Sequence, residues 1–141
     1  MISVDIVSNE KNWSKKIKKK KFFFHTICKS FPKKYQFVNK KISLTLLLSN
    51  NKCIKKLNKQ FRKKNKATDI LSFPLQKKIK LKKKSYIGDI IISYDFMDKP
   101  KNQEIELFKN KVIKTFIRSF PISVLFFIFL IFLIFLILFN P

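Results

Sequence analysis

Five cationic side chains lie between positions 59 and 66, and they are our candidates for a phosphate-binding site: Lys59, Arg62, Lys63, Lys64 and Lys66. The planar guanidinium of arginine can hold a phosphate through two parallel hydrogen bonds, whereas a lysine ammonium acts as a point charge. We therefore expect Arg62 to contact phosphate groups and the four lysines to lie along the same polyanion. The alternative is that Arg62 is a solvated surface residue without a ligand.

The net charge of the chain is strongly positive. It has 32 Lys and Arg residues against 8 Asp and Glu residues, which gives a formal charge of +24. Such a charge favours polyanionic partners, either RNA or anionic lipid. The alternative explanation is codon bias in an AT-rich genome, which favours lysine. Because only Arg62 and Arg118 are arginines, an arginine at position 62 indicates a geometric requirement.

The chain offers few side chains that could hold a metal ion. His25 is its only histidine, and Cys28 and Cys53 are its only cysteines. A catalytic zinc ion needs about three protein ligands around an open position, and no cluster supplies three at suitable spacing. We therefore assign no metal ligand and interpret His25 as a packed side chain. The cysteines form no C-x-x-C motif and are expected to be free thiols in a reducing cytosol.

The segments that must position these residues have the periodicities of strands and helices. Runs typical of strands, either alternating or wholly apolar, lie at residues 2–7, 42–48, 70–73 and 88–93. Amphipathic helices are predicted from residue 12 to the break at Pro32, after the capping residues 49–51, and at 103–117. The apolar run at 42–48 indicates an interior strand.

A pair of strands surrounds a lysine-rich connection. The first strand stops at Pro74, because proline lacks the N–H that a continuing ladder needs. The second opens with Gly88, the only glycine of the chain. We expect these two strands to pair, and Gly88 to adopt a positive φ or to form a bulge.

Two motifs around this strand pair resemble the YbeY family of bacterial endoribonucleases, which are also rRNA maturation factors. The first is Leu-Asn-x-x-Phe-Arg at 57–62 followed by Thr-Asp-Ile-Leu-Ser-Phe-Pro at 68–74, and the second is Gly-Asp-Ile-Ile-Ile-Ser at 88–93. They correspond to the family patterns L-N-x-x-Y/F-R, T-D-V/I-L-S-F-P and G-D-I-x-I-S, in the same order. The resemblance covers about residues 42–117.

The resemblance implies an α+β fold with a small mixed β-sheet, flanking helices and a zincin-like metallohydrolase topology. It implies a cytoplasmic, single-strand-specific, metal-dependent endoribonuclease that processes 16S rRNA on the small ribosomal subunit. Arg62 matches the family's functional arginine near the RNA-cleaving cleft, and would stabilise phosphate charge beside a catalytic zinc ion.

The chain departs from the family where the zinc ligands should lie. The family carries H-G-x-L-H-L-x-G-Y-D-H, and its three histidines should fall near Arg118, Ile122 and Ile128. No histidine is present there, so we expect this chain to bind no zinc and to be inactive as a nuclease. The competing hypothesis is a non-catalytic, tail-anchored basic protein that binds RNA or anionic lipid.

The C-terminal segment has a different composition. Residues 122–139 are apolar except for Ser123, and as a helix they would extend about 27 Å, marginally enough for a bilayer core. One interpretation is a C-terminal hydrophobic helix that anchors the protein in a membrane; the other is the product of a slipped reading frame. We accordingly divide the chain into a YbeY-like domain at 1–119 and a hydrophobic tail at 120–141.

Overall fold

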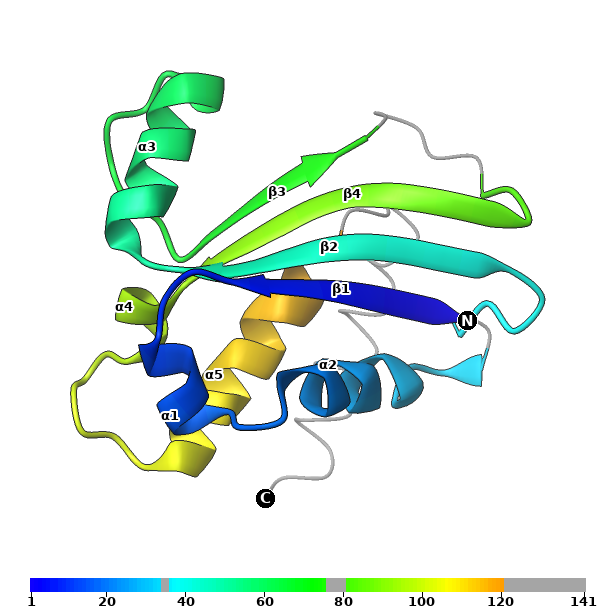
Figure 1. Ribbon diagram of the computed structural model, residues 1–141, viewed down its shortest axis with the longest axis horizontal. Coiled ribbons are helices and arrows are strands. Elements are labelled where there is room, and N and C mark those ends of the chain that lie inside the picture. The colour runs from blue at the N-terminus through cyan, green and yellow to red at the C-terminus, as the bar shows by residue number, and fades with distance from the viewer. Residues whose placement is uncertain (34–35, 76–80, 121–141) are drawn as a thin grey trace.

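The computed structural model describes residues 1–33, 36–75 and 81–120. The strands are β1 (Ile2–Ser8), β2 (Lys41–Ser49), β3 (Ile70–Pro74) and β4 (Lys84–Ser93). The helices are α1 (Asn12–Lys16), α2 (Lys20–Lys29), α3 (Asn51–Arg62), α4 (Tyr94–Met97) and α5 (Ile105–Arg118). Strands and helices follow one another in the order β1-α1-α2-β2-α3-β3-β4-α4-α5 (Figure 1). The predicted α+β fold is confirmed.

The four strands form one mixed sheet in the order β1-β2-β4-β3. β1 pairs with β2 and β2 with β4 in parallel, whereas β3 is antiparallel to β4. β2 therefore lies inside the sheet, as its apolar sequence predicted. β3 and β4 pair as expected for two strands around a lysine-rich connection, with Ile70 opposite Ile92 and Pro74 opposite Gly88.

The main hydrophobic core lies between one face of the sheet and the helices α1, α2 and α5 (Figure 1). Trp13 of α1 is fully buried there, and its ring meets the rings of Tyr94 and Phe108 at centroid distances of 5.6 Å. Its indole Nε1 donates a 3.0 Å hydrogen bond to the carbonyl of Ser49, so the polar atom of this buried aromatic is satisfied. These contacts fix α1 and α5 against the end of β2.

The opposite face of the sheet is covered only in part by the described residues. A small cluster of Ile54, Leu71 and Ile91 packs α3 against β3 and β4. Leu71 and Ile91 are buried, whereas Phe73 is only half-buried, although the Phe61 ring of α3 meets it edge to face. The end of α3 and the uncovered part of this sheet face therefore form one continuous surface.

Gly88 allows β3 to pair closely with β4. Its φ is +131°, a conformation that residues with a side chain rarely adopt. A Cβ at this position would collide with the carbonyl oxygen of Phe73 on the neighbouring strand. The register of β2 against β4 shifts between Ser43 and Thr45, beside this glycine. The positive φ predicted for Gly88 is confirmed, and the register shift beside it interrupts the regular pairing of β2 with β4.

One local expectation needs correction. The helical segment predicted from residue 12 is two helices, because Ile17 has an extended backbone and its buried side chain packs into the core between them. The short helix α4 follows β4 directly, and its buried Met97 packs into the same core. In both places a core contact decides the local backbone conformation.

The predicted C-terminal hydrophobic helix lies outside the described residues. Among residues 1–33, 36–75 and 81–120, no helix combines the length and the apolar character needed to cross a membrane.

Candidate functional site

Caps at both ends of α3 determine where the basic cluster lies. At the first turn, the side chain of Asn50 accepts a 3.0 Å hydrogen bond from the backbone N–H of Cys53, as the sequence predicted. At the last turn, Lys63 adopts a left-handed conformation with φ of 58°. Its N–H donates to the carbonyl of Lys59, and the N–H of Lys64 donates to that of Asn58. The chain consequently turns sharply after Arg62.

Asn58 holds the loop that follows α3, a role that the sequence analysis missed. Its side chain is buried, and its Nδ2 donates a 2.8 Å hydrogen bond to the carbonyl of Lys66. Asn58 is a polar residue among lysines on a helix, so its burial could not be predicted from its type. The only signal in the sequence was that it belongs to the Leu-Asn pair of the first motif. Asn58 thereby fixes Lys66 relative to the end of the helix.

The structure brings all five candidate cations to one end of α3. Lys59 and Arg62 lie in the last turn of the helix, and Lys63, Lys64 and Lys66 lie in the loop after it; all five are exposed. Like charges at this spacing repel one another, so the cluster is a surface suited to a polyanion.

Arg62 is held by the edge strand. Its Nη2 donates a 3.3 Å hydrogen bond to the carbonyl of Ser72 in β3, and its guanidinium carbon lies 6.0 Å from the centre of the Phe73 ring. The guanidinium of Arg62 thus lies against β3, while the residue remains exposed to solvent. Since arginine has five N–H donors, most of them stay available to a ligand.

A groove opens beside Arg62 on the uncovered face of the sheet. It has a volume of about 470 Å³ and is lined by Val7, Thr45, Leu47, Leu57, Phe61, Phe73, Asp89, Ile90 and Ile91. The rings of Phe61 and Phe73 meet edge to face at 5.3 Å, and Phe61 is 59% exposed. The groove thus has an aromatic edge, formed by Phe61 and Phe73, which lies next to the basic end of α3.

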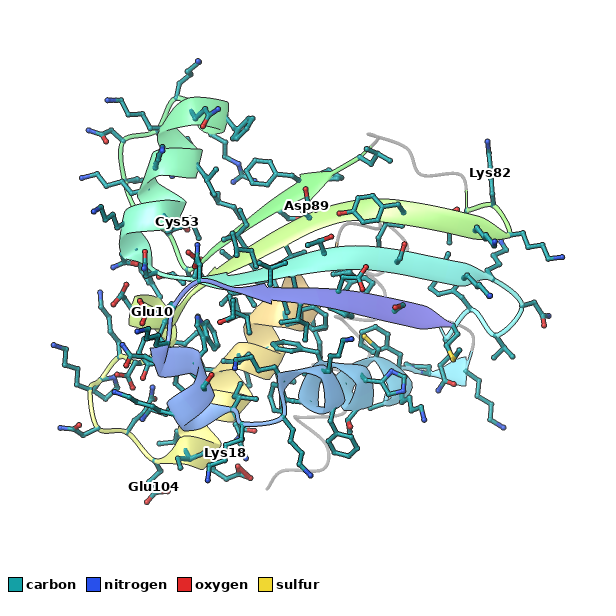
Figure 2. All side chains as sticks on the ribbon, in the orientation of Figure 1. Glu10, Lys18, Cys53, Lys82, Asp89 and Glu104 are labelled. Carbon is teal, nitrogen blue, oxygen red and sulfur yellow. The ribbon has the colours of Figure 1, made fainter. Side chains whose placement is uncertain are left out.

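The polar wall of this groove comes from β2 and β4. The hydroxyl of Tyr86 donates to Asp89 Oδ1 and lies 2.8 Å from the hydroxyl of Thr45 (Figure 2 labels Asp89). Burial raises the pKa of Tyr86, and the hydrogen bond to Asp89 raises it further. The tyrosine therefore stays neutral at pH 7 and orients the Asp89 carboxylate. The recorded hydrogen-bond partner of Asp89 is this side chain.

The second arginine also contacts the β3 segment. Arg118, at the end of α5, forms an ion pair with the carboxylate of Asp69, just before β3. The backbone carbonyl of Asp69 accepts a 2.9 Å hydrogen bond from the N–H of Ser93. The guanidinium lies at the position where the family motif would place its first histidine.

The donor set around Arg118 does not fit a zinc ion. A guanidinium cannot coordinate a cation. The guanidinium of Arg118 is paired with the carboxylate of Asp69, which could otherwise have been a metal ligand. No group of three His, Cys, Asp or Glu side chains converges anywhere in the described part of the chain. We therefore derive no step of the chemistry from a bound metal.

The remaining candidate ligands lie away from Arg62. His25 is exposed on α2, so the interpretation of a packed histidine is wrong: its side chain faces outward while its neighbours Phe24 and Ile27 occupy the core. Cys28 is buried, and burial raises the pKa of its thiol to about 12. Cys53 is half-buried on α3. Both cysteines are free thiols, as predicted.

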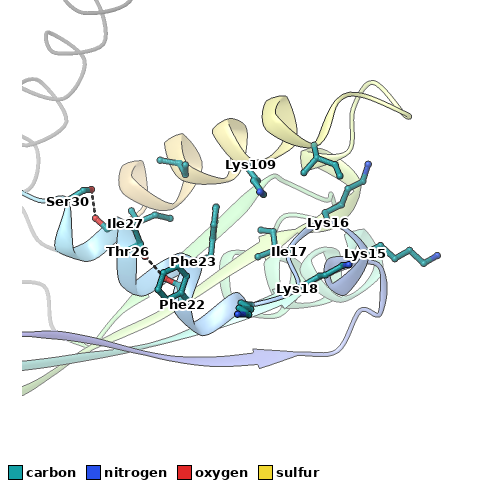
Figure 3. A pocket seen from close by; sticks show the side chains of 13 residues that line it. Lys15, Lys16, Ile17, Lys18, Phe22, Phe23, Thr26, Ile27, Ser30 and Lys109 are labelled. Carbon is teal, nitrogen blue, oxygen red and sulfur yellow. Dashed lines mark hydrogen bonds between the residues drawn. The ribbon is translucent and has the colours of Figure 1, made fainter.

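A second groove lies on the other side of the molecule, between α1–α2 and α5 (Figure 3). It has a volume of about 640 Å³, with an apolar floor and lysines such as Lys15, Lys18 and Lys109 around it. None of its lining residues belongs to the two sequence motifs. The groove beside Arg62 therefore remains the candidate site.

The fold and the two motifs identify the chain as a member of the YbeY family. The model of that family, Endoribonuclease YbeY, matches residues 6–120. The chain is 63% identical over 120 residues to the Endoribonuclease YbeY of Pelagibacter ubique (strain HTCC1062), covering 85% of this chain and 78% of that protein. It is 36% identical over 97 residues to the Endoribonuclease YbeY of Ehrlichia canis (strain Jake), covering 69% of this chain.

The matches do not extend over the whole of every relative. The chain spans only 59% of the Ehrlichia canis protein. Among solved structures, the solution structure of TM1509 from Thermotoga maritima is similar with a TM-score of 0.51, covering 84% of this chain and 69% of that chain. At 22% identity this likeness supports the fold alone.

Proposed function

We propose that the chain belongs to the endoribonucleases that process rRNA, and that its described part is the RNA-binding half of such an enzyme. The observation that carries the proposal is Arg62, which belongs to the family motif and is fixed on β3 among four exposed lysines. The name Endoribonuclease YbeY of the Pelagibacter relative supports an RNA substrate. By resemblance, this substrate is single-stranded 16S rRNA of the small subunit in the cytoplasm.

In this proposal, Arg62 binds a backbone phosphate of the RNA. Its hydrogen bond to Ser72 orients the guanidinium in advance, so little reorganisation is needed when the phosphate binds. Lys59, Lys63, Lys64 and Lys66 neutralise the neighbouring phosphates. Zinc, in the family, would activate water or polarise the phosphate. The described residues do not supply its ligands, so we propose RNA binding without metal-dependent cleavage.

The alternative of a tail-anchored basic protein is supported only by residues 122–139, which lie outside both the described residues and the family match. Family membership does not favour it.

A filter-binding titration with a single-stranded 16S rRNA fragment tests the proposal. If each of the five cations neutralises one phosphate of a single strand, the affinity falls with a log–log salt slope of about −3 to −4. The double variant Lys63→Ala/Lys64→Ala should bind more weakly and reduce this slope. The control, Lys18→Ala/Lys19→Ala, removes the same charge from exposed residues around the other groove. Equal effects of the two double variants, or a flat salt response, would contradict the proposal.

A further inference from the structure

We propose that the groove beside Arg62 is a pocket for one unpaired nucleobase of the bound RNA. This inference rests on the proposed function, because it assumes that the RNA backbone follows the basic end of α3. The lining residues supply an aromatic surface and a polar wall, and Arg62 adds a cation beside the Phe73 ring. A pocket for a nucleotide base requires these three features.

The aromatic surface comes from Phe61 and Phe73, on α3 and β3. Phe61 is 59% exposed although it belongs to the apolar face of its helix. Its edge-to-face contact with Phe73 fixes both rings, and Leu57 lies beside them on the groove wall. Proteins that bind single strands use such exposed rings as platforms on which bases stack. A volume of about 470 Å³ is sufficient for one base.

The position of Arg62 favours a nucleotide over a purely apolar ligand, because the guanidinium can bind a phosphate group beside the groove. Its guanidinium carbon lies 6.0 Å from the centre of the Phe73 ring, which lines the groove. A phosphate bound to this fork would place its own base over Phe61 and Phe73. The positive charge around the opening, from Lys59 to Lys66, complements a polyanion and disfavours a cationic partner.

The polar wall points to a base that donates a hydrogen bond. Tyr86 occupies Asp89 Oδ1, and Oδ2 has no recorded partner among the described residues. A carboxylate oxygen accepts from an exocyclic amino group, as in the contact of Asp or Glu with N4 of cytosine. Uracil carries a carbonyl oxygen at the same position, which a carboxylate repels. The pocket should therefore prefer cytosine to uracil.

Selectivity for single strands follows from the same geometry. A base within a duplex has its faces stacked and its pairing edge occupied, so neither the phenylalanine rings nor Asp89 can reach it. Only an unpaired base can enter a groove that closes on the sheet.

The test compares short oligonucleotides that differ only in cytosine or uracil, by fluorescence anisotropy with the full chain. We expect cytosine to bind about five-fold more tightly or better, equivalent to one good base contact. Phe61→Ala should weaken binding of both oligonucleotides about five-fold or more, because stacking is lost, with the salt slope unchanged. Asp89→Asn should abolish the preference for cytosine, whatever its effect on overall affinity.

Phe22→Ala is the matched control, since Phe22 is a 69% exposed phenylalanine on α2, at the other groove. Equal effects of Phe61→Ala and Phe22→Ala, or equal affinities of the wild-type chain for cytosine and uracil, would overturn the pocket while leaving the proposed function intact. Failure of every variant and of the wild type to bind RNA would overturn both. Circular dichroism confirms that each variant folds.

Discussion

Arg62 differs from the surrounding lysines in its shape and not in its charge. Its guanidinium is anchored to Ser72 at 3.3 Å while other donors remain available. We predict that Arg62→Lys, which keeps the charge, weakens RNA binding about five-fold or more, because the fork and the anchor are lost. Lys82→Ala removes a whole charge from an exposed residue just before β4 and should cost less, and filter binding measures both. An equal loss for the two variants would indicate that only charge matters.

The two thiols should differ in reactivity. Cys28 is 4% exposed and its thiol has a pKa of about 12, so it stays protonated and shielded at pH 8. Cys53 is only half-buried. We predict that Ellman's reagent modifies Cys53 first in the folded chain and reaches Cys28 only on denaturation. With Cys53→Ser, the fast phase should disappear; a fast phase that persists would contradict the burial of Cys28.

The residues of the candidate site were predictable to different degrees. Arg62 and its lysines could be chosen from their type and clustering, because charge is visible in a sequence. The Asp89–Tyr86 pair could not, because strict alternation puts residues three apart on opposite faces of a strand. The register shift beside Gly88 brings them to the same face. Burial of Asn58 was equally hidden, since it depends on the loop carbonyl that the side chain binds.

At the scale of elements, α3 carries the candidate site and depends on its N-terminal cap. Asn50 accepts from the N–H of Cys53 at 3.0 Å and donates to Glu10 Oε2 at 3.1 Å. We predict that Asn50→Ala lowers the free energy of unfolding by about 1 kcal/mol or somewhat more, since both contacts are lost. Urea unfolding measures the change.

Asn65→Ala is the control for this cap, because Asn65 is an exposed loop residue beyond the same helix. It should change the free energy of unfolding by less than about 0.5 kcal/mol. The same loss in both variants would show that the cap contributes nothing specific.

Elements were more predictable than their arrangement. Periodicity located β2, α3 and α5, because a buried face imposes a period of 2 or 3.6 on the sequence. The order β1-β2-β4-β3 depends on contacts between distant segments, and no local pattern encodes it. The end of the first helix at Lys16 was obscured for a related reason: the lysines fit a helix, but burial of Ile17 requires an extended backbone.

At the scale of the whole molecule, the chain has the two sequence motifs of the family and lacks the family's histidine motif. Arg62 and its groove lie within residues 6–120, the region that matches the family. Arg118 pairs with Asp69 where a zinc ligand is expected, and Ile122 and Ile128 stand at the next two expected histidines. One histidine in 141 residues cannot replace three.

We predict that the chain binds RNA but shows no zinc-dependent cleavage of it. Zinc content by mass spectrometry should stay well below one equivalent, and a chelator should leave RNA binding unchanged, because Arg62 and the lysines need no metal. One equivalent of tightly bound zinc, with cleavage abolished by the chelator, would show that a metal site has been misplaced.

The hypothesis of a slipped reading frame is tested by a second measurement, the nucleotide sequence of the gene after codon 118. If another frame encodes H-G-x-L-H-L-x-G-x-D-H there, the corrected protein should cleave single-stranded RNA with the same Arg62 and the same groove.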